Sequence, residues 1–304
     1  MAKHAYLSAS ASERWLKCPP SAKLCAQEED RGSPYAQQGT DAHELCQYLV
    51  ETALGRPSKD PTEDLTWYNA EMQEAAEDYR DFVMEQVEAA KQFCKDPLVC
   101  VEQTLDFSKW VEHGFGTGDC VIVADDLLHI IDFKFGLGVL VEAAGNSQLK
   151  CYALGAVDTF GDLYDIRRIR LSIYQPRREH TDTWELTKDE LLRWADEVLA
   201  PTAKLAYEGE GKFAAGPHCQ FCKVKPGVVD ADRNPILDSS ELYSGIIGRA
   251  SINFYAFNSN GNKGIACGLN NIQKLADGTP FGGHSRAEDD FADVDDEDDE
   301  DFLG

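Results

Sequence analysis

Basic residues are scarce in this sequence. Its 304 residues include 29 lysines and arginines against 54 aspartates and glutamates, a formal net charge of −25. Because nonspecific nucleic-acid binding depends on neutralising phosphates with basic side chains, a broad electrostatic DNA-binding surface is disfavoured. The excess of acid is uneven, since Glu288–Gly304 holds eleven acidic residues and no basic one. DNA binding would therefore need a local basic groove or bound metal ions.

Long apolar runs are also missing. No segment approaches the ~20 consecutive apolar residues of a membrane-spanning helix, and Met1–Ser10 lacks the apolar centre of a secretion signal. We therefore expect a cytoplasmic protein with no membrane partner. The ten cysteines then do not indicate a disulfide framework. Five of them lie in apolar patterns and are expected to be small buried residues: Cys46, Cys94, Cys100, Cys120 and Cys151.

Two hydrophobic periods alternate over the first 225 residues. Apolar residues recur at helical spacing over 8–28 (with a break at Pro19-Pro20), 39–54, 68–94, 140–160 and 187–207, and at a spacing of two over 98–107, 119–124, 127–134 and 167–174. Asp41 or Thr40 is expected to cap the helix at 39–54, and Thr187 with Glu190 has the spacing of a capping box. This order predicts an α/β fold with a mixed sheet flanked by helices.

The character of the sequence changes after Lys225. Residues 226–240 are a link rich in Pro, Asp and Asn, and strand-like stretches at 246–257 and 264–269 follow around a polar turn. A lone hairpin is marginally stable, so it must pack on something. Residues 283–304 are too charged to fold. We therefore divide the chain into a domain at 1–225, a segment at 226–282 and a disordered acidic tail at 283–304.

Two acidic residues and a lysine mark the strands around the turn at Asp125-Asp126. Asp119 lies near the start of the first strand and Asp132 near the end of the second, so both belong to the same end of the hairpin. Two converging carboxylates suit a hard divalent cation. Lys134 shares a face with Asp132, and its ammonium can stabilise charge that develops on a phosphorane. The alternative is a solvated ion pair, but charged residues on the apolar strand Ile130–Phe133 are costly unless they are used.

Three further residues extend this pattern. His43 follows Gly39-Thr40 at the start of a predicted helix, and Gln148 and Tyr152 lie one helical turn apart after the Asp132-Phe133-Lys134 strand. The order Gly-Thr…His, Gly-x-x-Asp, Asp-x-Lys, Gln-x-x-x-Tyr resembles the RecB-type branch of the PD-(D/E)XK nuclease superfamily. Within that branch it is similar to a phage family related to CRISPR-associated exonucleases. The resemblance covers residues 1 to about 225 and implies a restriction-endonuclease-like fold.

This resemblance implies a phage DNA nuclease, more specifically an exonuclease, that hydrolyses phosphodiesters during replication or recombination in a bacterial host cell. Mg²⁺ or Mn²⁺ would be bound by Asp119, Asp132, His43 and the Phe133 carbonyl, and Lys134 would serve catalysis. Two residues would position the DNA: Gln148 and Tyr152. For His43, the alternative is a histidine at a helix start that has no partner. For Tyr152, the alternative is ordinary packing in the core.

Cysteines near both ends of this region match part of a second pattern. Many relatives of the resembled family bind a four-iron four-sulfur (4Fe-4S) cluster through one N-terminal cysteine and a C-x₂-C-x₅-C segment. Three cysteines match: Cys18, Cys219 and Cys222. The last position is Val228, which cannot bind iron, and His218 or Cys25 would have to stand in, with no spacing that favours either. The alternatives are zinc on the three cysteines and His218, or three free thiols.

From about Pro226 the sequence resembles the C-terminal part of a phage single-stranded-DNA-binding protein family. The carrying residues are Pro235–Asp238, Leu242–Gly245, Ser251–Asn258 and Gly261–Asn270, and the acidic end Asp298–Gly304. The resemblance implies an OB-like barrel in which aromatic side chains stack on bases, of which this chain holds only part. The candidate stacking residues are Phe254, Tyr255 and Phe257, with barrel core as the alternative.

The acidic tail is expected to recruit phage or host replication and recombination proteins through its charge and through Phe302 and Leu303, unless it only solubilises the chain. The first resemblance ends near residue 225 and the second begins there, and each family pattern is incomplete at that point. We therefore hypothesise a fusion of two neighbouring phage genes. Three functions are then open. The chain is a nuclease with DNA as its partner, a single-stranded-DNA-binding and partner-recruiting protein with an inert nuclease fold, or a truncated fusion of low activity.

Overall fold

The computed structural model describes residues 5–28, 33–214, 216–224, 227–232, 236, 241–259 and 262–279. The chain divides into two compact units, Met1–Val224 and Lys225–Gly304. The acidic tail, with Phe302 and Leu303, lies outside the described residues.

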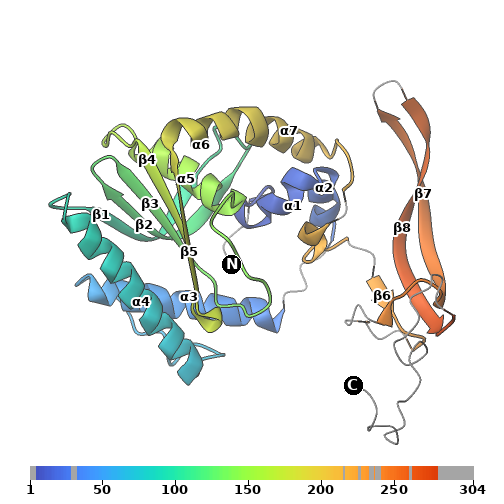
Figure 1. Ribbon diagram of the computed structural model, residues 1–304, viewed down its shortest axis with the longest axis horizontal. Helices are drawn as coiled ribbons and strands as arrows, with labels where there is room; N and C mark the ends of the chain where they lie inside the picture. Colours follow the sequence, from blue (N-terminus) through green and yellow to red (C-terminus); the bar gives the residue numbers. More distant parts are fainter. Residues whose placement is uncertain are drawn as a thin grey trace, which may run out of the picture. The chain divides into compact units, whose positions relative to one another are not determined.

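A five-stranded mixed sheet forms the centre of the first unit (Figure 1). Its strands are β1 (Leu98–Asp106), β2 (Phe115–Ala124), β3 (Leu127–Phe133), β4 (Arg168–Gln175) and β5 (His180–Thr187). They lie side by side in chain order. β3 and β4 pair in parallel, and the other neighbours pair antiparallel. The parallel pair needs a crossover connection, which α5 (Ser147–Phe160) supplies.

Helices cover both faces of this sheet (Figure 1). One face carries α3 (Pro34–Ala53) and α4 (Ala70–Lys91). The other carries α5, α1 (Ser12–Lys17), α2 (Pro20–Ala26), α6 (Lys188–Trp194) and α7 (Ala200–Glu208). Short 3₁₀ turns lie at Ala9–Ala11, Pro176–Arg178 and Pro217–Cys219, and a π-helical turn lies at Ala195–Leu199. The predicted α/β fold, a mixed sheet flanked by helices, is confirmed. No helix in the described parts of the chain has the length and apolarity needed to cross a bilayer.

Alternate residues of β2 and β3 point to opposite faces of the sheet and enter two separate cores. Val121 and Val123 join the core beneath α5, whereas Cys120 and Ile122 join the core beneath α3 and α4. Asp119 stands two residues before Val121 and therefore belongs to the α5 face. By the same alternation of side chains, polar residues at the ends of these strands are assigned to one face of the sheet.

The start of α3 differs from the prediction. The helix begins at Pro34, five residues earlier than expected, because the Ser33 hydroxyl caps it by accepting a hydrogen bond from a backbone amide. Asp41 is therefore not a cap. It lies inside the helix, buried, and its carboxylate accepts hydrogen bonds from the Gln37 side chain and the Trp67 amide. Thr40 is not a cap either, since its hydroxyl donates within the helix.

Two other elements correct the prediction. α5 begins at Ser147 and not at residue 140, because the Asn146 side chain caps it by accepting from the Leu149 amide. The edge strand β5 is absent from the prediction, since its polar residues leave no clear apolar face. The capping box that Thr187 and Glu190 were expected to form at the start of α6 is present.

The second unit contains a three-stranded sheet in the order β6 (Gly227–Val229), β8 (Asn262–Ala276), β7 (Ile247–Ser259). β7 and β8 form the predicted hairpin, longer than expected, and β6 adds a parallel strand from within the predicted link. Val228 lies in β6, opposite Ile272.

A buried histidine makes the stability of the first unit sensitive to acid. His129 in β3 is 3% exposed and bonds through Nε2 to the Ser172 hydroxyl at 2.8 Å. Burial, helped by Arg170, lowers the pKa of His129 to about 3. Below pH ~6.5 His129 is protonated in the unfolded chain, whereas in the folded chain it stays neutral until about pH 3. The free energy of unfolding therefore falls as the pH falls through this window.

We expect His129→Gln to remove this dependence of the free energy of unfolding on pH. Between pH 7 and pH 5, urea unfolding of the parent should lose about 2 kcal/mol that the variant keeps. His113→Gln, a change of an exposed histidine, is the matched control and should follow the parent. Parallel losses in parent and His129→Gln protein would contradict the assignment.

Candidate metal centre

Three neighbouring strands each bring one carboxylate to the same level of the sheet. The register that pairs Cys120 with Ile131 makes Asp119 and Asp132 the next cross-strand neighbours. The β1–β2 register places Glu102 opposite Asp119, on the β1 side of β2. Like charges in facing positions repel each other. The row of three acids is therefore unfavourable by itself and would be relieved by a cation.

Glu102 is a member of the site that sequence reasoning missed. Its backbone is left-handed, with a φ of 49°, which is uncommon for a residue other than glycine. Such strain collects at functional sites, where surrounding structure holds it in place. The signal in the sequence is weak: Glu102 is one of two acids in the predicted strand 98–107, the other being Asp106, and acids are common on the exposed side of strands.

His43 reaches this row from α3. Its Nδ1 lies 3.2 Å from Asp119 Oδ1 and 4.0 Å from Glu102 Oε1, and its ring packs edge-on against Phe133. Ligand atoms of these three polar residues lie within 4.8 Å of one another, the one such group of three among the described residues. His43 therefore has partners, and the alternative of an isolated helix-start histidine is not what the structure contains.

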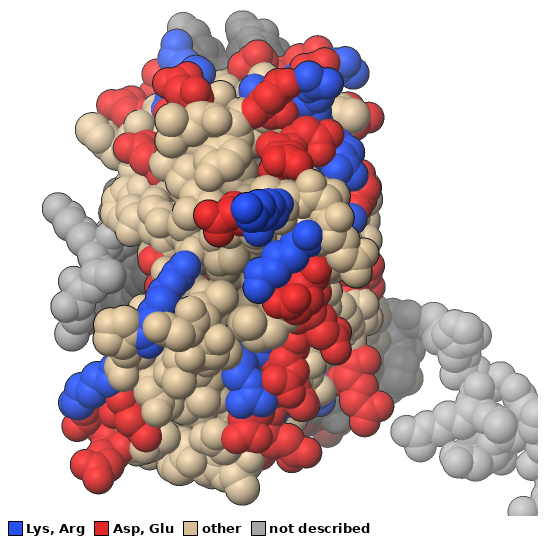
Figure 2. All heavy atoms as spheres, turned by 90° about the vertical axis from the view of Figure 1, so that its left-hand side faces the viewer, with Lys and Arg blue, Asp and Glu red and all other residues tan. Residues whose placement is uncertain are grey.

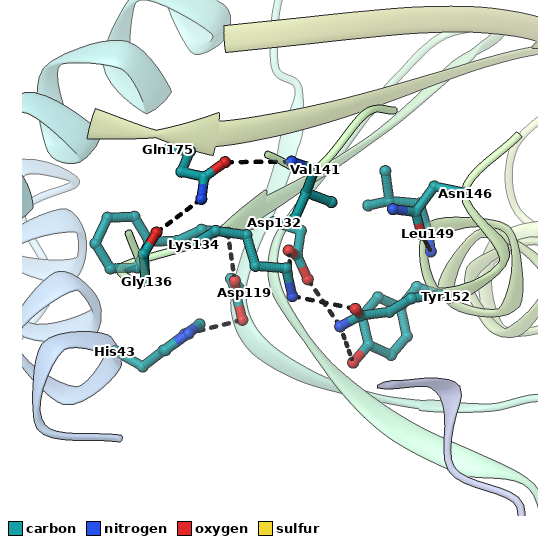
Figure 3. A network of polar contacts seen from close by, with 12 residues as sticks. His43, Asp119, Asp132, Lys134, Gly136, Val141, Asn146, Leu149, Tyr152 and Gln175 are labelled. Atoms are coloured by element: carbon teal, nitrogen blue, oxygen red, sulfur yellow. Dashed lines mark hydrogen bonds and ion pairs between the residues drawn. The ribbon is translucent and has the colours of Figure 1, made fainter. Parts of the chain in front are cut away.

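A chain of polar contacts continues from Asp132 to α5 (Figure 3). Lys134 Nζ lies 2.9 Å from Asp132 Oδ2 and donates to Gln148 Oε1 at 3.1 Å. Gln148 Nε2 donates to Asp132 Oδ1 at 3.0 Å and to the Tyr152 hydroxyl at 3.1 Å. Four sequence-predicted residues are thus brought together by direct contacts: Asp132, Lys134, Gln148 and Tyr152.

Phe133 contributes through its backbone and its ring. Its amide donates to Asp119 Oδ2 at 2.7 Å, which fixes the orientation of that carboxylate and leaves Oδ1 toward His43. The side chain is fully buried beneath α3 and α4. The expected role of the Phe133 carbonyl as a metal ligand stays a prediction.

The charges of the centre act on one another strongly. Burial raises the pKa of Asp132, and the charge of Asp119 adds to this. Burial, together with Asp119, raises the pKa of Glu102 to about 7. Burial would also raise the pKa of Asp119, but His43, the Phe133 amide and Lys134 hold it below its usual range. Burial would lower the pKa of His43, yet the neighbouring carboxylates raise it to about 9. Burial and mutual repulsion therefore oppose the ionisation of all three carboxyls when no cation is bound.

The donor set suits a hard divalent cation. Carboxylate oxygens are the ligands that Mg²⁺ prefers, and an imidazole beside them is accepted by Mn²⁺. Asp132 Oδ2 is buried and accepts no well-aligned hydrogen bond from the described residues; the Lys134 ammonium is its ion-pair partner. An under-satisfied buried oxygen on the cross-strand neighbour of Asp119 is what a cation would complete.

An apolar loop follows Lys134 directly. Residues 136–141 expose the side chains of Leu137, Val139 and Leu140. Gln175, which is 1% exposed, holds the loop: its Nε2 donates to the carbonyls of Gly136 and Val139 at 2.7 and 2.8 Å, and its Oε1 accepts from the Val141 amide (Figure 3). Three exposed apolar side chains thus belong to a loop that Gln175 holds by its backbone and that begins two residues after Lys134.

The cysteine-rich segment does not form the expected ligand set. Cys18 and Cys222 are buried, but the Cys219 thiol turns to the Ala214 carbonyl at 3.9 Å. Val228 is part of the second unit's sheet. No cysteine belongs to a group of three candidate ligands within 4.8 Å in the described chain, so a closed zinc tetrahedron is not formed. His218 bonds through Nε2 to the Ala214 carbonyl. These residues do not fit a cluster or zinc as they stand.

The candidate base-stacking residues lie on β7. Phe254, Tyr255 and Phe257 pair with Cys267, Ala266 and Gly264 on β8. Their side chains lie outside what the structure describes, so base stacking stays a prediction.

Family models match the chain in two places. The family described as "Protein of unknown function (DUF2800)" matches residues 4–240, and the family described as "Enterobacter phage Enc34, ssDNA-binding protein" matches residues 218–303. The matches overlap only at 218–240. The chain therefore has two parts with different relatives, the second of them similar to a phage protein, as the sequence predicted.

One solved structure, titled "Crystal structure of SSO0001", is 12% identical and covers 59% of this chain and 91% of its own, with a TM-score of 0.25. At that score the likeness supports no argument about fold or function.

Proposed function

The chain belongs to the DUF2800 family, and we propose that its first unit is a metal-dependent DNA nuclease of the PD-(D/E)XK type, acting as an exonuclease in phage replication or recombination. One observation carries the proposal: Glu102, Asp119 and His43 converge within 4.8 Å, and Asp132, the cross-strand neighbour of Asp119, holds a lysine. Carboxylates, an imidazole and an ammonium in one partly buried site are the groups that metal-dependent phosphodiester hydrolysis uses.

Four side chains would hold Mg²⁺ or Mn²⁺ there: His43, Glu102, Asp119 and Asp132. A bound cation would supply Lewis-acid activation of the phosphodiester. Lys134 stays an ammonium, because the carboxylates of Asp132 and Asp119 raise its pKa against the opposing effect of burial. It therefore serves as a fixed positive charge beside the phosphorus and not as a base. Gln148 and Tyr152 fix the direction of the lysine.

The surface charge supports a local mode of DNA binding. On the face drawn in Figure 2, acidic and basic side chains are interleaved without a continuous basic patch. With a net charge of −25, the protein would be repelled by a polyanion at long range. We infer that the cation, Lys134 and the loop at 136–141 provide the affinity near the scissile bond, with the loop's apolar side chains against unstacked bases.

The second part supports a single-stranded substrate. Because residues 218–303 match the phage single-stranded-DNA-binding family, we infer that Phe254, Tyr255 and Phe257 retain or guide a single strand. Partners in replication or recombination would then bind the acidic tail through Phe302 and Leu303.

The proposal is tested on the full chain with labelled linear and circular DNA, single- and double-stranded. We expect cleavage of linear single strands that requires Mn²⁺ or Mg²⁺ and stops with a chelator. Asp119→Asn should abolish cleavage and weaken Mn²⁺ binding in calorimetric titration. Cleavage of circular DNA would replace the exonuclease by an endonuclease, and metal-independent cleavage that Asp119→Asn retains would overturn the proposal.

The second candidate is a single-stranded-DNA-binding protein with an inert nuclease fold, favoured by the match of residues 218–303. The same samples discriminate. If the parent binds oligonucleotides tightly in fluorescence anisotropy but cleaves none, and if alanines at Phe254, Tyr255 and Phe257 abolish that binding, this second function replaces the first.

A further inference from the structure

Two buried thiols from opposite ends of the first unit touch each other. Cys25 lies in the last turn of α2 and Cys222 follows the turn Pro217–Cys219; 197 positions separate them in the sequence. Their Sγ atoms are 3.7 Å apart, and both residues are 7% exposed. This is the one sulfur–sulfur hydrogen bond among the described residues.

A metal site would need more ligands than these two thiols supply. In a four-iron cluster each thiolate holds its own iron, so ligand sulfurs do not meet directly. In a zinc site at least one more ligand would complete a compact group, and none among the described residues does so.

We propose that Cys25 and Cys222 are a redox-active pair that closes to a reversible disulfide, tying α2 to the segment that ends the first unit. The two sulfurs have to approach from 3.7 Å to the ~2.05 Å of a disulfide bond. A low-molecular-weight disulfide such as oxidised glutathione is the oxidant. One protein thiol attacks it and releases one glutathione thiol; the second protein thiol then displaces the other. Two protein thiols and one small disulfide become one protein disulfide and two small thiols.

Because of where the two cysteines lie in the chain, we expect formation of the disulfide to have a large effect on stability. A bond between Cys25 and Cys222 closes a loop that spans nearly the whole first unit, and the entropy removed from the unfolded chain grows with loop length. Lys23 in α2 bonds to the Glu208 carbonyl at the end of α7. The neighbouring helix α1 contacts the turn Pro217–Cys219 that precedes Cys222, so the two segments lie near each other before oxidation. Closure therefore locks an existing contact.

The test uses the full chain, fully reduced, freed of reductant and then incubated with oxidised glutathione before alkylation and trypsin digestion. We expect the peptides 24–31 and 213–223 to be joined with the loss of two hydrogens. Because 213–223 contains both Cys219 and Cys222, fragmentation must assign the bond, and Cys219→Ser should retain it. The oxidised protein should unfold about 5–10 °C higher than the reduced one.

Cys25→Ser should abolish both the crosslink and the shift in unfolding temperature, whereas Cys94→Ser, a change of a buried thiol elsewhere, should retain both. The parent's peptides decide the matter even if Cys25→Ser fails to fold. Separate alkylation of the two cysteines, or a bond between Cys219 and Cys222, would overturn the proposal. So would stoichiometric zinc, or the broad visible absorption of an iron–sulfur cluster, in anaerobically purified protein when Cys25→Ser removes it.

Discussion

Asp132→Asn is expected to reduce metal-dependent DNA cleavage by about 10³-fold or more. The substitution keeps the shape of the side chain and its acceptor for Gln148, but it removes a carboxylate that is 2% exposed and lies beside Asp119. An amide is a weak ligand for a hard cation. Losing about 4 kcal/mol of transition-state stabilisation corresponds to this factor. Single-turnover cleavage of a labelled oligonucleotide at saturating Mn²⁺ measures it.

The matched control lies at the other end of the same hairpin. Asp126 forms an exposed ion pair with Arg168 at 2.8 Å, so Asp126→Asn should change cleavage less than about twofold. Both variants should unfold within a few degrees of the parent. Parental cleavage by Asp132→Asn would remove this residue from the centre, and equal loss in both variants would indicate a damaged hairpin.

Three charged members of the centre follow from local spacing along the chain: Asp119, Asp132 and Lys134. Asp132 and Lys134 share a face because strand side chains alternate, and Asp119 meets them because a tight turn at Asp125-Asp126 sets the register. Gln148 joins them because α5 crosses over directly after β3. These relations span few residues, and for that reason the sequence predicts them.

Other features depend on contacts distant in sequence. Glu102 enters the site through a left-handed backbone that no residue type in its neighbourhood signals. Cys25 meets Cys222 only after the two ends of the unit pack together. The early start of α3 depends on the choice between two plausible caps, Ser33 and Asp41, and Asp41 is used instead to bind Trp67. Spacing along the chain cannot decide such cases.

Lys134→Met is expected to destabilise the metal-free protein and to strengthen its response to metal. Without the ammonium, Asp132 keeps its burial and the repulsion of Asp119 but has lost its counter-charge. Breaking a fully buried ion pair costs about 3–5 kcal/mol, and we expect about 2–3 kcal/mol here because the Lys134 side chain is 27% exposed and Asp132 can take up a proton. The loss should appear in urea unfolding of chelator-treated protein.

Mn²⁺ should recover more stability in this variant than in the parent. A ligand that binds only the folded state stabilises it by about 2.7 kcal/mol at a hundred times its dissociation constant, and the variant binds the cation more tightly because no ammonium competes for Asp132. Cleavage should nevertheless fall about 10²–10³-fold, since the fixed charge next to the phosphorus is gone. Lys109→Met, which removes an exposed lysine paired with Asp158, should match the parent in both measurements. Tighter metal binding together with lost cleavage separates a catalytic lysine from a structural one; weaker metal binding would place Lys134 among the supports of the fold.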